Sequence, residues 1–184
     1  MVVSVCVFLN CSAIFQIFTT LPLYHHDKFG LTEFQSGLLL SLNGLIIFFL
    51  EMPVVSLFER KQISKIKIIL WGSLFMAISF YVLLMTGWAS ILIVSIIFVT
   101  FGEMFIFPFS NSFALSRAPK GHEGRYMALF TMSFSLAHIT SSKSGMEMIS
   151  LFGYQANWLL MGTLGILAVL SCFRLLYLLQ IENN

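Results

Sequence analysis

The chain has 184 residues, of which 58% are hydrophobic and 10% are charged, and its formal net charge is +2. Soluble domains typically contain about 25% charged residues, so this composition excludes an ordinary water-soluble fold. The small net charge gives no reason to expect a nucleic-acid-binding surface.

The first two expected elements are long apolar segments. A helix needs about 20 mostly apolar residues to cross a hydrocarbon core of roughly 30 Å. Residues 2–24 contain no charge and are followed by the polar sequence HHDKFGLTEFQS, which predicts a loop. Residues 37–58 form the second expected span and include Glu51 and Pro53. The chain therefore enters the membrane almost at its first residue, which is typical of an internal piece of a longer polypeptide.

The third and fourth expected spans come from one continuous apolar region. Residues 68–116 carry Glu103 as their only charge, and at 1.5 Å per residue a single helix of that length would be more than twice too long for a bilayer. The sequence TGWAS, residues 86–90, predicts the turn. It separates a third span, residues 68–86, from a fourth, residues 91–113.

Residues 126–150 and 158–177 are the fifth and sixth expected spans. The prediction is an all-α polytopic membrane protein, a single six-helix transmembrane bundle over residues 1–184. Spans one to three and spans four to six cross the membrane with opposite topology, so the bundle is predicted to consist of two inverted three-helix repeats.

Basic residues predict the orientation, because cytoplasmic loops carry an excess of Lys and Arg. Eight of the ten Lys and Arg residues are expected on the cytoplasmic side, and the two exceptions are Lys28 and Lys143. We therefore expect an integral protein of the plasma (bacterial inner) membrane with both termini in the cytoplasm. The residues expected on the cytoplasmic side are Arg60, Lys61, Lys65, Lys67, Arg117, Lys120, Arg125 and Arg174.

Ionisable residues inside spans are the strongest functional signal. A charge near the bilayer centre costs at least about 2.5 to 3.5 kcal/mol on insertion scales, and such residues usually face the protein interior. Counting along the helices places Glu103 and His138 about 15 to 18 Å deep, where they could meet if their helices face each other. The residues expected in a proton-coupling site or cavity are Glu103, His138, Glu51, Asn10, Gln16 and Asn43.

Each of these residues also has a structural interpretation. Glu103 is either a protonated acid hydrogen-bonded to a neighbouring helix or a titrating group in a proton or substrate path. His138 is either part of that path or a packing residue. Glu51 precedes Pro53 by two residues and is either functional or part of a helix kink. Lys143 and Glu147, four residues apart, are expected to neutralise each other.

Small residues predict where helices pack closely. They recur at four-residue spacing on the fifth span and appear again on the second, and such stripes let another backbone approach. Together with the polar residues, they predict that spans one, two, four and five are interior and that spans three and six face lipid. The expected packing residues are Gly37, Ser41, Ser133, Ala137, Ser141 and Gly145.

No residue pattern predicts a metal or a cofactor. Cys6, Cys11 and Cys172 lie in apolar runs without metal-ligand spacing and are interpreted as small packing residues. His25, His26 and Asp27 resemble metal ligands by type, but adjacent residues in an exposed loop are usually solvated.

Two long segments resemble a known family. GEMFIFPFSNSFALSRAPKGHEGRYMALFTMSFSLAHI is similar to the tenth and eleventh helices of major facilitator superfamily transporters of the drug:proton antiporter type. LPLYHHDKFGLTEFQSGLLLSLNGLIIFFLEMPVV resembles their seventh and eighth helices. The chain departs from the family pattern in the loop ERKQISKIK and in the sequence TSSKSG of the fifth span.

The resemblance implies the C-terminal six-helix half of a twelve-helix transporter fold. It would place Glu103 on a cavity-lining helix and Arg125 in a cytoplasmic loop that helps lock the inner gate. Glu59 and Arg60 correspond to the family's acid–arginine pair, and Arg117 lies in the same loop as Arg125.

The function expected from the sequence is half of a secondary active transporter, which exports small amphipathic compounds in exchange for protons and is not an enzyme. Its expected partners are the lipid bilayer, a small-molecule substrate and a complementary six-helix half or a second copy, with no nucleic acid. One alternative is a truncated or non-transporting membrane protein that acts as an interaction subunit or inactive fragment. Another is an intramembrane enzyme that uses Glu103 and His138, for which no nucleophile motif is visible.

Overall fold

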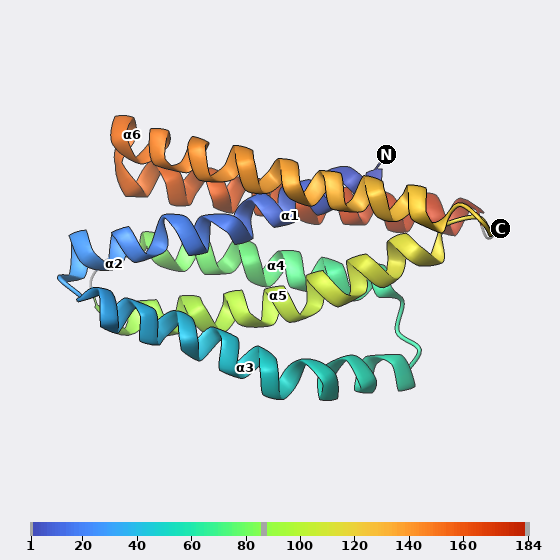
Figure 1. The fold of residues 1–184 in the computed structure, drawn as a ribbon, viewed down its shortest axis with the longest axis horizontal. Helices are drawn as coiled ribbons and strands as arrows, with labels where there is room; N and C mark the ends of the chain where they lie inside the picture. Colours follow the sequence, from blue (N-terminus) through green and yellow to red (C-terminus); the bar gives the residue numbers. More distant parts are fainter. Residues whose placement is uncertain (1, 86–87, 183–184) are drawn as a thin grey trace.

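The computed structural model describes residues 2–85 and 88–182, and within these ranges it is helical without strands (Figure 1). The all-α prediction is therefore confirmed for the described residues. The turn expected at residues 86–90 falls partly on residues 86–87, which lie outside the described ranges. The helices are α1 (Val2–Thr19), α2 (Leu21–Phe29), α3 (Glu33–Arg60), α4 (Lys65–Leu84), α5 (Ser90–Ser116) and α6 (Glu123–Glu182).

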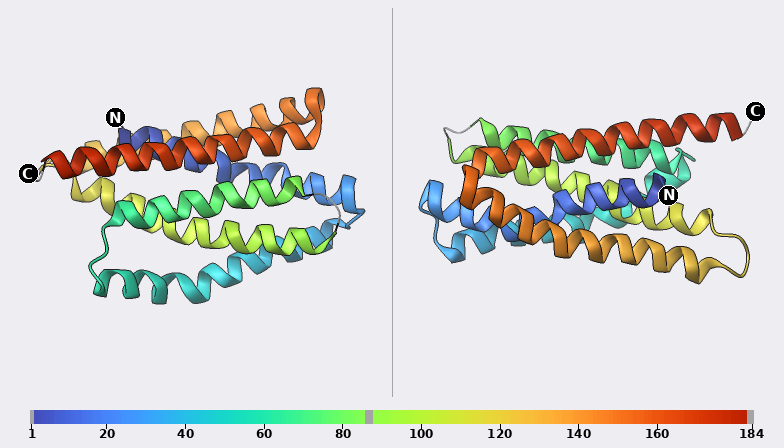
Figure 2. Two further views of the ribbon diagram at one scale, coloured as in Figure 1. Left: turned by 180° about the vertical axis from the view of Figure 1, so that it is seen from behind. Right: turned by 90° about the horizontal axis from the view of Figure 1, so that it is seen from above.

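Helix α6 is folded back on itself at Gly153. This residue has φ 81° and ψ 176°, a conformation that is essentially restricted to glycine. Residues 123–152 form an outgoing arm and residues 154–182 a returning arm, and the two arms diverge from the turn with α1 between them (Figure 2, right). The fifth and sixth expected spans lie in these arms.

The two ends of the bundle differ. One end, called here the terminal end, holds the start of α1, the last turns of α6 and the α3–α4 and α5–α6 connections. The other, called the turn end, holds α2 and Gly153. Every Lys and Arg that the sequence assigns to the cytoplasmic side therefore lies in a connection or helix end at the terminal end.

Residues 25–29 correct the sequence analysis, because they belong to helix α2 (Leu21–Phe29) instead of a loop. Pro22 lies in the first turn of α2, where its missing N–H is not needed. Gly30 ends the helix with φ 64°, and its N–H donates to the His26 carbonyl at 2.9 Å. The loop prediction is therefore wrong for residues 25–29 and also for residues 33–36, which form the start of α3.

Helix α3 begins after a complete capping box. The Gln35 backbone N–H donates to the Thr32 hydroxyl at 3.3 Å, and the Thr32 N–H donates to the Gln35 side-chain oxygen at 2.9 Å. These two bonds satisfy donors that the first turn of a helix leaves without partners. They fix where the chain turns from α2 into α3.

Helix α4 packs at the centre of the bundle, between α5 and the returning arm of α6. A Cβ atom added to Gly72 would lie 2.9 Å from the Phe105 Cβ and 3.0 Å from the Gly102 carbonyl oxygen, and one added to Gly165 would lie 2.9 Å from the Ala77 Cβ. Missing side chains at these glycines allow the backbones to approach closely.

The expected division into interior and lipid-facing spans is wrong within this chain. Most residues of α4, the third expected span, are buried or half-buried, whereas the residues that α3 buries in the described chain are Ser36 and Asn43. Polar residues indicate only which side of α3 faces protein. They do not show how much of its remaining surface another helix of this chain covers.

Replacing Gly72 with Ala is expected to destabilise the chain by about 1 to 3 kcal/mol, because the new methyl group would crowd Ile106 Cγ1, Phe105 Cβ and the Gly102 carbonyl oxygen of α5. Thermal unfolding in detergent micelles measures the effect. Gly37→Ala is the matched control, since its added Cβ would have no neighbour within 4 Å. Equal melting temperatures for the two variants would contradict the close α4–α5 contact.

Candidate functional site

The candidate site is a buried polar chain between α3 and α5. The Asn43 amide nitrogen donates to Glu103 Oε2 at 3.0 Å, and the Thr100 hydroxyl donates to Asn43 Oδ1 at 2.6 Å. Glu103 is buried, with only 3% of its surface exposed. Sequence analysis expected Glu103 and Asn43 near a common cavity, and the structure brings them into direct contact.

Helix periodicity places Thr100 and Glu103 on one side of α5. They are three residues apart, so both side chains point toward α3. The Thr100 hydroxyl also lies 2.7 Å from the Ile96 carbonyl of its own helix, which restricts its rotation. Thr100 thus holds the Asn43 carbonyl oxygen, and this contact directs the amide nitrogen of Asn43 toward Glu103.

Glu103 is incompletely satisfied. Its Oε1 atom has no hydrogen-bond partner among the described residues, and no ion pair to Glu103 is present there either. An ionised carboxylate that is buried without a cation costs several kcal/mol. This setting therefore requires either a proton on Glu103 or a positively charged partner when the acid ionises.

His138 and Glu51 do not join this chain of contacts. His138 lies on the outgoing arm of α6, is exposed, and packs against the Phe15 ring at a centroid distance of 4.4 Å. Within the described residues, no hydrogen bond or ion pair links His138 to Glu103. Glu51 is half-buried on α3, two turns beyond Asn43.

Gln16 is the centre of a second buried polar group, called here the Gln16 cluster: Gln16, Thr20, Ser141 and Asn157. The Gln16 amide nitrogen donates to the Ser141 carbonyl of the outgoing arm. Its oxygen accepts from Thr20 at 3.0 Å and from Asn157 of the returning arm at 3.4 Å. One side chain of α1 thus bonds to both arms of α6.

The other predicted cavity and packing residues divide between buried and exposed positions. Asn10 is buried and donates to the Cys6 carbonyl of its own helix at 3.0 Å. Ser141 donates to the Ser12 carbonyl at 2.6 Å, and Ala137 and Gly145 are buried on the same arm. Ser133 donates within its own arm to Leu129. Gly37 and Ser41 are exposed on α3.

The four residues assigned to the gate loops lie at the terminal end. Glu59 and Arg60 end α3, Arg117 follows α5, and Arg125 lies in the first turn of α6. All four are exposed. Glu59 and Arg60 therefore adjoin the α3–α4 connection, and Arg117 and Arg125 adjoin the α5–α6 connection.

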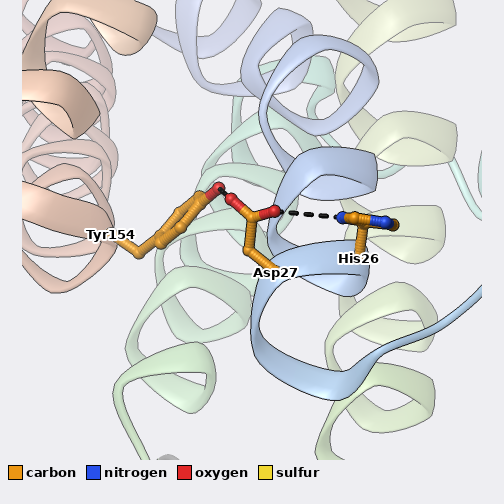
Figure 3. Close-up of polar contacts among 3 residues, drawn as sticks. All are labelled: His26, Asp27 and Tyr154. Carbon is orange, nitrogen blue, oxygen red and sulfur yellow. Dashed lines mark hydrogen bonds and ion pairs between the residues drawn. The ribbon is translucent and has the colours of Figure 1, made fainter.

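A polar contact joins α2 to α6 at the turn end. The Tyr154 hydroxyl donates to Asp27 Oδ2 at 2.6 Å, and His26 Nδ1 lies 3.1 Å from Asp27 Oδ1 (Figure 3). Asp27 is exposed and lies beyond the expected first span. The hydrogen bond from Tyr154, followed by the bond and charge of His26, holds the pKa of the Asp27 carboxyl below its ordinary value.

His25, His26 and Asp27, which resemble metal ligands by type, differ in their exposure. His25 is fully buried, whereas His26 and Asp27 are exposed. Among the residues that the structure describes, no group of three His, Cys, Asp or Glu side chains is arranged to hold a metal ion.

Replacing Tyr154 with Phe is expected to lower the melting temperature at neutral pH, with a smaller difference in acid. A folded-state pKa below the unfolded value adds stability above the ordinary Asp pKa of about 4, and this contribution is lost as pH falls through the folded-state value. Melting curves of both proteins in detergent at pH 7 and pH 3 test this. Tyr177→Phe, at an exposed position, is the control. A difference that is equal at both pH values would contradict the role of Asp27.

Sequence reasoning missed Thr100 and Asn157. Thr100 carried a usable signal, because it lies three residues before the only charge of its span. Asn157 carried none, because its contact with Gln16 depends on the reversal of the chain at Gly153.

Four helices of the described chain are long and apolar enough to cross a membrane, or five if the bent pair Val5–Thr19 and Leu21–Phe29 is one span. This count includes α6 as a single helix, although Gly153 divides it into two arms. The chain thus has the apolar helices of an integral membrane protein.

Comparisons with known proteins agree with this architecture. The chain is 25% identical over 166 residues to the uncharacterized MFS-type transporter YttB of Bacillus subtilis, a match that covers 90% of this chain and 41% of that protein. Two crystal structures of POT family transporters share the fold. The complex with 5-aminolevulinic acid has a TM-score of 0.79 at 21% identity, and the complex with a thioalcohol-conjugated peptide 0.78 at 22%.

These matches cover nearly all of this chain but only part of each relative. The two structural matches cover 96% and 97% of this chain, and 39% and 41% of the chains compared. The chain thus spans about two fifths of the length of these relatives. The family model described as Major Facilitator Superfamily matches residues 3–183. The chain therefore belongs to the Major Facilitator Superfamily.

Proposed function

We propose that the chain is the C-terminal six-helix half of a twelve-helix transporter of the drug:proton antiporter type. The chain spans about two fifths of the length of its relatives, and the reversal at Gly153 gives α6 two apolar arms, which supports a six-span bundle with two inverted repeats. The grouping of basic residues at the terminal end supports a plasma-membrane location with both termini in the cytoplasm.

The proposed partner is a complementary six-helix half or a second copy of the chain. Helix α3 exposes large apolar side chains, among them Phe34, Phe48 and Met52, on a helix that buries few of its residues in the described chain. Lipid and a companion half are both suitable neighbours for such a surface. Since alternating access moves one half against the other, transport requires the companion.

The single observation that carries the proposed mechanism is the buried Glu103 carboxyl, bonded to Asn43 and without a cation among the described residues. In this mechanism Glu103 binds a proton when the site opens to one side and releases it when the site opens to the other. The Asn43 amide bonds Oε2 in both states, and Thr100 fixes the orientation of that amide.

The proposed substrates are small amphipathic compounds that the protein exports. Phe105 and Phe107 follow Glu103 on α5 by two and four residues, and both are half-buried. Apolar walls around one acid favour compounds that combine an apolar body with a polar or positively charged group.

A second candidate function is a non-transporting subunit or an inactive fragment. The observation that favours it is that the chain covers about two fifths of its relatives, so that alone it supplies only part of a two-sided cavity. In this case the Glu103 contacts would serve helix packing only.

Ethidium efflux under an imposed pH gradient tests the proposal. Membrane vesicles would contain the chain alone or the chain together with a companion N-terminal half, and nigericin would remove the gradient in a parallel sample. The proposal expects gradient-dependent efflux with the pair, or with the chain alone if two copies assemble. Efflux that does not respond to nigericin would exclude proton coupling, and no efflux in either sample would favour the inactive fragment.

A further inference from the structure

Two of the three cysteines meet near the terminal end of the bundle. Cys6 lies on α1 and Cys172 on the returning arm of α6, and their sulfur atoms are 2.9 Å apart. Both are free thiols and both are buried. They are 166 positions apart in the sequence, so this contact is produced by the fold and not by local structure.

The surroundings of the pair are apolar and closely packed on most sides. Ile66 and Ile69 of α4 and Phe109 of α5 belong to the same buried cluster. Outside the pair, the Asn10 amide nitrogen lies 3.5 Å from the Cys6 sulfur. The two thiols are thus enclosed by residues of four helices, α1, α4, α5 and α6.

A small cavity adjoins the two thiols. Its volume is about 10 Å³, and its lining includes Cys6, Cys172 and the hydroxyl-bearing Ser110. This volume is at the lower limit for a molecule the size of water. Hydrogen peroxide is larger than water, so it reaches the sulfur atoms only when the side chains that line this cavity move apart.

We propose that Cys6 and Cys172 form an oxidation-sensitive pair, which a peroxide converts into a disulfide between α1 and the returning arm of α6. A disulfide has an S–S length of about 2.05 Å, so the sulfur atoms need to approach by less than about 1 Å. This inference is independent of the proposed transport function.

The reaction balances with one peroxide molecule per pair. One cysteine, as its thiolate, attacks a peroxide oxygen, the O–O bond breaks, and a sulfenic acid and hydroxide form. The second sulfur attacks the sulfenic sulfur, the S–O bond breaks, and a second hydroxide leaves. The two thiol protons convert the hydroxides into water, so two thiols lose two electrons in total and hydrogen peroxide is reduced to two water molecules.

Cys11 provides an internal comparison. It is as deeply buried as Cys172, at 1% exposure, and lies in a separate apolar cluster with Val7 and Ala137. The structure gives Cys11 no hydrogen-bonded sulfur neighbour among the described residues. Burial alone therefore predicts the same reactivity for Cys11 and Cys172, whereas the proposed pair predicts different reactivities.

The test treats the full chain in detergent with hydrogen peroxide and then labels the remaining thiols with a maleimide reagent after denaturation. Trypsin then cleaves the exposed connection at Lys61, which separates Cys6 from Cys172 along the chain. Non-reducing mass spectrometry detects whether the two peptides stay joined. Cys11→Ala, Cys6→Ala and Cys172→Ala are treated in parallel.

We expect the unmodified chain to retain one thiol of three and to yield joined peptides that dithiothreitol separates. Cys11→Ala should still form the disulfide, whereas Cys6→Ala and Cys172→Ala should not. Three retained thiols in the folded chain, under conditions that oxidise the SDS-denatured chain, would overturn the proposal. Oxidation of Cys11 to the same extent as Cys172 would also overturn it, because it would show indiscriminate attack on buried thiols.

Discussion

Replacing Glu103 with Gln is expected to lower gradient-driven efflux at least about tenfold, while the chain remains folded. The carboxamide has the same shape, and its oxygen can still accept the hydrogen bond from Asn43 that Oε2 accepts at 3.0 Å. The exchangeable proton is what the substitution removes. A tenfold loss corresponds to about 1.4 kcal/mol. This is less than the free-energy cost of burying an unpaired carboxylate, which is several kcal/mol.

The matched control is Glu147→Gln, which removes an exposed carboxylate 3.9 Å from Lys143 and should leave efflux unchanged. Efflux would be followed with ethidium in vesicles that contain the chain and its companion half. Thr100→Val should have an intermediate effect, because it loosens the orientation of Asn43 without removing the acid. Efflux that Glu103→Gln leaves intact would exclude proton coupling through this residue.

Replacing Gly145 with Ala is expected to destabilise the chain by about 2 to 4 kcal/mol. The added Cβ would overlap with the side-chain amide of Gln16, which is fully buried and cannot swing into solvent. To make room, Gln16 must give up its hydrogen bonds in the Gln16 cluster, including those to Ser141 and Asn157. Buried polar groups left without partners add to the loss of free energy of unfolding.

A double-mutant cycle separates this overlap from a general effect of alanine. Gln16→Ala combined with Gly145→Ala should be less destabilised than the sum of the two single variants, because the overlap exists only when both side chains are present. Gly44→Ala, whose added Cβ has no neighbour within 4 Å, controls for helix propensity. Unfolding would be measured by heating in detergent micelles. Additive effects in the cycle would contradict the contact between Gln16 and Gly145.

From the sequence we could predict which buried polar side chains require a hydrogen-bond partner, but we could not predict which residue is that partner. Glu103 stands out in an apolar span because a buried acid needs a partner, and Asn43 was expected near a cavity for the same reason. That the two meet depends on the crossing of α3 and α5, which no local pattern contains. Counting along the helices placed His138 and Glu103 at similar depth, but it could not show whether their helices face each other, and the structure places His138 on Phe15.

The packing predictions show the same limit. The stripe through Ala137, Ser141 and Gly145 was visible because its residues recur on one helix face, and the structure places it against α1. Gly72 and Gly102 form a close contact between two helices, but each is a single glycine in its own span. One glycine carries no periodic signal, so the central position of α4 could not be predicted.

The reversal at Gly153 also determines when the chain can complete its folding. Gln16 lies on α1, yet the groups of α6 that satisfy its amide, Ser141 and Asn157, follow it by 125 and 141 residues in the sequence. Until they arrive, α1 carries unsatisfied polar groups in an apolar environment. Helix α1 therefore reaches its final set of hydrogen bonds only after both arms of α6 have been synthesised and have packed against it.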